Sequence, residues 1–477
     1  MFESLRFRAE TRWVAWKPTV LVVSAISLSG FFAYHLPTNR QLLLMVGLLP
    51  MLAMITLIFR YPPLGLIITV AAGLAVPFSL GTGTQTTLHL VALFIPILFG
   101  HWLLHAGLYQ RQIRLHPVHS VYIIIAFTVV VLLAFILGQM PWYTIARAPM
   151  TAQIGGLAIF LISIMAFILA AHQLDQVWLQ RLVFTFLLIG TFYMMGRLFP
   201  AFGYQLSPFF VRGSASSAFW IWLVALPTGL AFFDNTQALW RRSLLLGLST
   251  ITLYVGIQQA QWASGWFPGL VGFFVIVWLR FRRLGWTVAF IGLIFFVTNF
   301  EQIFGIATTD QSWWARRQAW QIVLEISQIN PILGLGPANY FFYVQQATIF
   351  GWGGTWNVQF SSHNNYVDLI AQTGLLGLSL FIWFAISVGS VGWKLFKELP
   401  QGFVKGYVAA SLGGLVGTLV SGMLGDWILP FVYNVGIAGM RSSVLFWIFL
   451  GGLLALHLQS KGYCQINIHK SPYHHTQ

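Results

Sequence analysis

The sequence consists mainly of long apolar runs separated by short polar connections. The runs are mostly about 15 to 20 residues long, and at ~1.5 Å rise per residue a helix of that length crosses the ~30 Å hydrocarbon core of a bilayer. They are too long and too continuous for the alternating strands of a membrane barrel. The pattern predicts an all-α, polytopic membrane protein with about 14 transmembrane helices, the first near residues 19–34 and the last near residues 444–458.

One polar stretch is much longer than the other connections and divides the chain into three parts. Residues 1–300 are expected to hold transmembrane helices 1 to 11, residues 301–365 a long loop with short helices, and residues 366–477 helices 12 to 14 and a tail. An even number of spans places both termini on one side. The basic N-terminal segment indicates that this side is cytoplasmic. The long loop is therefore expected on the extracytoplasmic face.

Composition agrees with a membrane protein. Of the 477 residues, 58% are hydrophobic and only 7% are charged, whereas roughly a quarter of the residues of soluble domains are charged. The formal net charge of +15 does not indicate nucleic acid as a partner, because the basic residues lie mainly in alternate short loops. All lysines fall on the expected cytoplasmic side. The cations left outside are all arginines and are candidates for function, since positive charge opposes export: Arg40, Arg147, Arg197, Arg212, Arg316, Arg317 and Arg441.

Two kinds of motif are absent from the sequence. There is no DxD-type carboxylate pair for a metal and a nucleotide diphosphate, and no GxxxxGK[ST] loop for ATP. We therefore expect no metal, no cofactor and no nucleotide-driven chemistry. A transporter or flippase is the alternative class, and it predicts either ionisable groups or discontinuous helices at the membrane midplane. No predicted span carries a charge near its middle, but Gly73, Pro77 and Pro227 interrupt spans and keep this alternative open.

The polar stretch ends with SSHNNYVDLIAQTGLLGL, residues 361–378, at the mouth of an apolar helix. If Ser361, Ser362 or Asn364 caps this helix, its free backbone N–H groups and positive dipole end form a site for an anion such as phosphate. His363 lies at the same mouth and is able to accept a proton or to donate a hydrogen bond. A second interpretation is that His363 only caps the helix.

Upstream, residues 312–320 read SWWARRQAW. Helical spacing places Trp313, Arg316 or Arg317, and Trp320 on one stripe, which continues at Val323 or Leu324. Such a helix is expected at the membrane surface, where its arginines either bind a phosphate group specifically or are attracted to anionic headgroups in general. The following NPILGLGPANYF predicts a helix end and then a tight turn at Gly334, Gly336 and Pro337.

Other outer cations have simpler interpretations. Arg212 precedes GSASSAFW at the start of a span, beside a predicted helix N-terminus, whereas Arg197 is expected to reach headgroups only. Asp426 and Arg441 in the last outer loop are candidates to pair with each other, and neither is assigned chemistry.

Three features in this order resemble the O-antigen ligase and polymerase superfamily of bacterial membrane glycosyltransferases. They are the arginine-rich helix with its trailing tryptophan, the NPxLGxGP turn, and SHNxYxDxxxxTGLLG opening a span. The resemblance covers residues 212–423 and is most specific over residues 316–377. Members transfer glycans from undecaprenyl diphosphate carriers: ligases to lipid A-core, polymerases to another carrier-linked repeat, and related transferases to protein hydroxyls. The resemblance implies a bacterial inner membrane location, an undecaprenyl-diphosphate-linked glycan donor, and a glycan or lipid acceptor.

The resemblance also assigns roles to residues. It identifies His363 as the catalytic histidine and Arg316 or Arg317 as the arginine of the loop, with Arg212 as a further diphosphate ligand. Many members also carry a Ser-Arg-Gly type motif where this chain reads QWASGWFPG, residues 261–269, without an arginine, so that Arg317 or Arg212 compensates or the diphosphate is held differently. The motif residues expected to support the site are Asn364, Tyr366 and Asp368, of which Asp368 is also an alternative base handicapped by burial.

Overall fold

The structure is a computed structural model that describes residues 56–81, 87–109, 111–112, 115–207, 216–259, 263–299, 311–348 and 359–461. The chain divides into two compact units, residues 1–65 and 66–477, and the candidate site lies in the second. The first of the expected transmembrane helices lies outside the described residues, as does most of the second.

The described residues are almost entirely helical, which confirms the expected fold class in outline. The only strand pairing in this part is a short antiparallel one, with Leu80 opposite Leu88. The elements are α3 (Pro62–Ala75), β1 (Leu80–Gly81), β2 (Thr87–Leu88), α4 (Leu90–Leu104), η1 (His105–Tyr109), α5 (His119–Leu137), α6 (Met150–Gln173), α7 (Gln176–Leu198), α8 (Pro200–Leu206), α9 (Ser217–Phe233), α10 (Leu239–Gln259), α11 (Ala263–Arg280), α12 (Arg282–Thr298), α14 (Gln311–Ser327), α15 (Tyr340–Tyr343), η3 (Val344–Thr348), α16 (Asn365–Glu398), α17 (Phe403–Leu424), η4 (Ile437–Gly439) and α18 (Met440–Ser460).

Seven helices in the described part of the chain are long and apolar enough to cross a membrane. Three shorter apolar helices accompany them: Pro62–Ala75, Ser217–Phe233 and Ser264–Arg280. The seven are Leu90–Leu108, His119–Leu137, Met150–Gln173, Gln176–Leu198, Asn365–Glu398, Phe403–Leu424 and Ile437–Ser460. A multi-pass membrane protein is therefore supported, while the total of about 14 spans stays a prediction.

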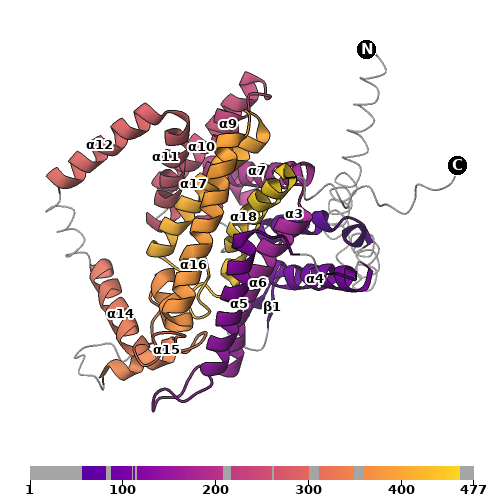
Figure 1. Ribbon diagram of the computed structural model, residues 1–477. Coiled ribbons are helices and arrows are strands. Elements are labelled where there is room, and N and C mark those ends of the chain that lie inside the picture. The colour runs from indigo at the N-terminus through magenta and orange to yellow at the C-terminus, as the bar shows by residue number, and fades with distance from the viewer. Residues whose placement is uncertain are drawn as a thin grey trace. The chain divides into compact units, whose positions relative to one another are not determined.

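Helices α9 and α18 form the interior of the helical bundle. Of the apolar window of α18, 94% is buried, and nearly every residue of α9 is buried. α9 contacts α10, α11 and α17, while α18 contacts α6 (Figure 1). Small residues permit these close contacts, as is usual between membrane helices. A Cβ atom on Gly413 of α17 would lie 2.6 Å from the carbonyl oxygen of Gly272 in α11.

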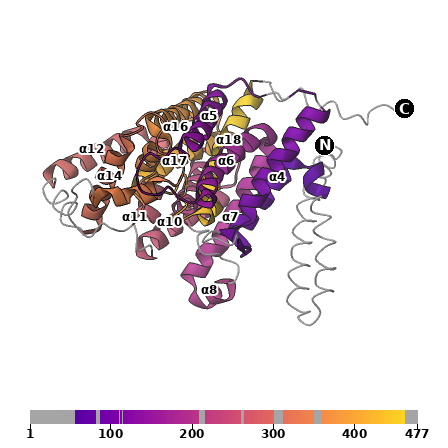
Figure 2. The same cartoon turned by 90° about the horizontal axis from the view of Figure 1, so that it is seen from below.

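Helices α16 and α17 form an antiparallel hairpin. Only residues 399–402 connect them, so that the start of α16 and the end of α17 lie at the same end of the pair. In two perpendicular views, α14 and α4 lie on opposite sides of the group formed by α5, α6, α16 and α17 (Figures 1 and 2). The residues near the start of α16 therefore meet α14 from one side and the chain that follows α17 from another.

Candidate active site at the start of helix 16

Helix α16 is broken shortly after it begins. Gly374 has φ 71° and ψ −176°, a combination that is essentially restricted to glycine. The segment of residues 330–337 fills the break with backbone hydrogen bonds. Leu335 N and Gly336 N donate to the carbonyls of Ala371 and Gln372 over 2.8 and 3.1 Å, and Leu375 N and Leu376 N donate to the carbonyls of Pro331 and Ile332 over 2.8 and 3.2 Å. Helix α16 is thus discontinuous near its N-terminal end, and the groups that the break frees bind protein backbone.

The predicted tight turn at Gly334 and Gly336 is confirmed. Both glycines have positive φ, 71° and 85°, and both lie where a Cβ atom would meet backbone. Asn339 ties the turn to α5, because its Nδ2 donates to the carbonyls of Gly138 and Leu335 over 3.0 and 2.8 Å. The turn therefore joins α5 to the broken helix.

The SHN motif forms the N-terminal end of α16, and Asn364 is its capping residue. The Asn364 Oδ1 accepts from Tyr366 N over 2.9 Å and from Val367 N over 3.4 Å. Two expectations are therefore corrected. Those two N–H groups are not free to bind an anion, because the Asn364 side chain occupies them, and His363 is not the cap. His363 instead has a φ of 50°, in the left-handed region.

Asp368 holds the SHN motif from inside the protein. This carboxylate is 2% exposed, and its Oδ1 accepts from Tyr340 Oη over 2.5 Å and from Ser362 Oγ over 2.7 Å. The Tyr340 hydroxyl also accepts from Ser362 N over 3.3 Å. Burial, followed by the charge of Asp368, raises the pKa of Tyr340 well above its usual value, so this hydroxyl stays a donor. Asp368 thus holds the SHN motif in position through Ser362 and Tyr340. Because it is buried, this role fits it better than abstraction of a proton from a substrate.

Helix α14 packs its predicted stripe against the SHN motif. The Trp320 Nε1 donates to the Ser362 carbonyl over 2.7 Å, and the rings of Trp313 and Trp320 meet at 5.4 Å. The stripe continues at Val323, which is buried, rather than at Leu324, which is 38% exposed.

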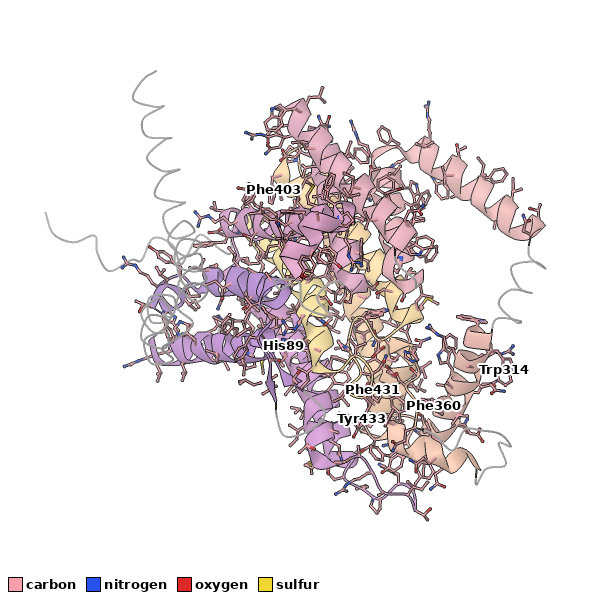
Figure 3. The ribbon with its side chains drawn as sticks, turned by 180° about the vertical axis from the view of Figure 1, so that it is seen from behind. His89, Trp314, Phe360, Phe403, Phe431 and Tyr433 are labelled. Atoms are coloured by element: carbon pink, nitrogen blue, oxygen red, sulfur yellow. The ribbon has the colours of Figure 1, made fainter. Side chains whose placement is uncertain are left out.

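The two adjacent arginines of α14 have different surroundings. Arg316 Nη1 donates to the carbonyl of Leu424, at the C-terminal end of α17, over 2.9 Å. Arg317 is exposed. Trp314, also exposed, lies on the side of α14 that faces away from the helical bundle (Figure 3). Arg316 is therefore the arginine that the structure brings to the SHN motif.

His363 lies at the end of a series of hydrogen-bonded side chains, His363–Asn434–Asp426, which was not predicted from the sequence. Its Nδ1 lies 3.0 Å from Nδ2 of Asn434, which donates to Oδ1 of Asp426 over 2.7 Å. Asp426 is 1% exposed, and its Oδ2 accepts from Phe431 N over 2.9 Å. Burial lowers the pKa of His363, the charge of Asp426 opposes this shift, and the charge of Arg316 adds to it. His363 therefore lies within electrostatic reach of both Arg316 and Asp426.

Residues 244–382 match the family model described as O-Antigen ligase. Over this segment the chain is similar to the O-antigen ligase family. The match confirms the resemblance inferred from the motifs, and it includes Arg316, Arg317, His363 and the break at Gly374. No curated protein matches the chain. Asp426 and Asn434 lie beyond the ligase-family segment.

The chain that follows α17 is fixed to the ligase-family segment by Asn365. Its Nδ2 donates to the Leu429 carbonyl, and its Oδ1 accepts from Ile428 N, both over 2.8 Å. Aromatic rings complete the contact, since Tyr340 and Phe431 stack at 4.6 Å. Phe431 and its neighbours Phe360 and Tyr433 appear together in Figure 3 and belong to one hydrophobic cluster.

The remaining candidates lie elsewhere. Arg441 does not take Asp426 as its partner, because its guanidinium donates to the carbonyls of Gly73, Val76 and Phe78 over 3.2, 3.0 and 2.7 Å. Arg212 lies outside the described residues, as do the first two residues of the QWASGWFPG stretch. A signal for Asp426 existed in the sequence, since it is an acid in an outer loop, but nothing in the sequence pointed to Asn434.

Proposed function

We propose that the protein transfers a glycan from an undecaprenyl-diphosphate carrier to an acceptor hydroxyl, on lipid A-core or on another lipid-linked glycan, without a metal ion. The observation that carries this proposal is the placement of the Arg316 guanidinium and the His363 imidazole at one end of α16. Both belong to the ligase-family segment. Such transfer is a step in the synthesis of lipopolysaccharide or a related cell-envelope polysaccharide.

The leaving group in this reaction is the lipid diphosphate, whose negative charge grows as the glycosidic bond breaks. A guanidinium has five N–H donors, so the bond from Arg316 to the Leu424 carbonyl leaves others for phosphate oxygens. The positive end of the α16 dipole lies at the same place. Arg317 and Arg212 are proposed as further ligands of the diphosphate. Removing one such group typically lowers the rate about 10²- to 10³-fold.

His363 is assigned the role of orienting or deprotonating the acceptor hydroxyl. The imidazole is half-buried and lies next to the expected diphosphate site. A positioned histidine that orients or deprotonates a nucleophile typically contributes about 10²- to 10⁴-fold to the rate. Direct attack by the hydroxyl on the anomeric carbon breaks the bond to the diphosphate and inverts the configuration there, and the hydroxyl proton passes to His363 or to a phosphate oxygen of the leaving group.

The site is proposed to face the extracytoplasmic side of the bacterial inner membrane. Lys394, Lys397 and Lys405 cluster at the turn between α16 and α17, ~30 Å along the unbroken part of α16 from the break at Gly374, at ~1.5 Å per residue. Cytoplasmic ends of membrane helices are rich in lysine and arginine. The opposite end, which carries His363, then lies outside, where carrier-linked glycans are transferred.

The test uses the purified full-length protein in liposomes with glycan-loaded undecaprenyl diphosphate and candidate acceptors, with chelator and without nucleotide. The acceptors are lipid A-core, a second carrier-linked glycan and a hydroxyl-bearing peptide. We expect glycan transfer with release of undecaprenyl diphosphate, reduced at least about 10²-fold in His363→Ala and Arg316→Ala. Arg283→Ala is the matched control, because Arg283 is an exposed arginine in the first turn of α12.

Two results would contradict the proposal. Transfer that survives both substitutions would remove Arg316 and His363 from the site. Solute flux across the same liposomes that survives both substitutions, without transfer to any acceptor, would favour a transporter.

A further inference from the structure

The amide of Asn434 lies between a carboxylate and the catalytic-site histidine, and one atom of it contacts both. Nδ2 of Asn434 is 2.7 Å from Oδ1 of Asp426 and 3.0 Å from Nδ1 of His363. Burial raises the pKa of Asp426, while the Phe431 N–H, the charge of His363 and the Asn434 amide oppose this shift by stabilising the carboxylate. The ionised carboxylate only accepts hydrogen bonds, so the amide group that faces it is the NH₂ group. The second hydrogen of that NH₂ group then points to His363.

This geometry decides which nitrogen of His363 carries the proton. A nitrogen that accepts a hydrogen bond presents its lone pair, so Nδ1 is unprotonated. In a neutral imidazole the proton then resides on Nε2. Burial and the nearby Arg316 both favour the neutral ring, because they lower the pKa of His363, although Asp426 opposes them.

We propose that Asn434 is a positioning residue that transmits the negative charge of Asp426 to Nδ1 of His363 and thereby fixes the histidine as an Nε2–H hydrogen-bond donor. The proposal rests on the proposed function for its consequence in catalysis. His363 then donates to a substrate oxygen, either of the acceptor hydroxyl or of the leaving diphosphate. It acts as a base at Nε2 only if the side-chain amide of Asn434 flips, so that its oxygen and not its NH₂ group faces Nδ1.

The position of Asp426 gives the proposal a sharp test, because one of its oxygens is already assigned. Oδ2 accepts from Phe431 N over 2.9 Å, so in Asp426→Asn the new amide oxygen stays with Phe431 and the new NH₂ group faces Asn434. Asn434 then turns its own oxygen toward that NH₂ group. This oxygen also faces His363, which becomes an Nδ1–H donor with a free lone pair on Nε2.

The experiment is nitrogen-15 NMR of the full-length protein in lipid, labelled at histidine, with His363 signals assigned by their loss in His363→Gln. We expect the wild-type ring to carry its proton on Nε2, and the Asp426→Asn ring to carry it on Nδ1. Asp175→Asn is the matched control, since Asp175 caps the distant helix α7 through Trp178 N and should leave the His363 spectrum unchanged. In the transfer assay, Asn434→Leu should lower kcat at least about tenfold with a smaller change in KM.

Either of two spectra would overturn the proposal: a wild-type His363 protonated on Nδ1, or a folded Asp426→Asn protein whose His363 keeps its proton on Nε2. The wild-type spectrum does not depend on Asp426→Asn, so it decides the first point even if that variant fails to fold. The spectra also need no substrate. If they agree with expectation while the wild-type protein transfers no glycan, the proposed function fails and the positioning by Asn434 stands.

Discussion

The break in α16 makes the sharpest structural prediction, because a single methyl group should undo it. Gly374 has φ 71° and ψ −176°, and residues other than glycine hardly occupy this region. A Cβ atom there would also collide with the carbonyl group of Ile332. Gly374→Ala therefore has to move residues 330–337 out of the break.

The expected cost follows from the contacts that this movement breaks. The strained backbone alone costs of order 1–3 kcal/mol for alanine. If the backbone instead relaxes, the hydrogen bonds that join Leu335, Gly336, Leu375 and Leu376 to the opposite segment are lost. At about 0.5–1.5 kcal/mol each, these represent about 2–6 kcal/mol in total. Displacement of the SHN motif by ~1 Å is enough to lower the rate about 10²-fold.

The assay compares thermal unfolding and glycan transfer of Gly374→Ala with those of Gly247→Ala. A Cβ atom on Gly247 meets nothing within 4 Å, and this residue lies inside helix α10, so alanine there should be neutral or stabilising. The reasoning is refuted if Gly374→Ala is as stable and as active as the wild type.

Two further predictions concern charge and burial at the site. Transfer activity should persist as the pH falls through 6.5 and decline only below it, because burial and Arg316 lower the pKa of the His363 ring, which must be neutral to accept from Asn434. The pH–rate profiles of the residual activity of two variants test this. Arg316→Gln removes a charge that lowers the pKa of His363, so it should move the acid limb to higher pH, and Asp426→Asn removes a charge that raises this pKa, so it should move the limb to lower pH. Shifts of both variants in the same direction would contradict the prediction. Tyr340→Phe should lower the free energy of unfolding by about 1–3 kcal/mol in denaturant titration, because it removes a donor from a buried carboxylate; unchanged stability would show that the bond contributes nothing.

Much of the fold was predictable because its signal is local. Apolar runs and their breaks report helices residue by residue, and most of the expected spans from residue 64 onward correspond to helices of the structure. The stripe of α14 was predictable for the same reason, since helical spacing alone places Trp313, Arg316 and Trp320 on one side. What the stripe meets was not predictable. Trp320 binds the Ser362 carbonyl, a contact between segments that no local pattern connects.

The candidate site shows the same limit. Motif spacing pointed to His363 and to an arginine pair, and the structure then distinguishes Arg316, which reaches the end of α17, from the exposed Arg317. Asn434 carried no signal, because an asparagine in a loop is most often a turn residue. Its contact with His363 depends on how the α16–α17 hairpin ends.

The length of that hairpin explains why the break is needed. Helix α17 has 22 residues and is ~33 Å long at ~1.5 Å per residue, whereas a straight α16 would extend ~50 Å and carry Asn365 well past the end of α17. Yet Tyr366 Oη donates to the Leu419 carbonyl over 2.7 Å, and Asn365 Nδ2 to that of Leu429 over 2.8 Å. A change of direction at Gly374 accounts for both contacts. It returns the SHN motif to the end of α17, so the break is what brings His363 to Asp426 and Asn434.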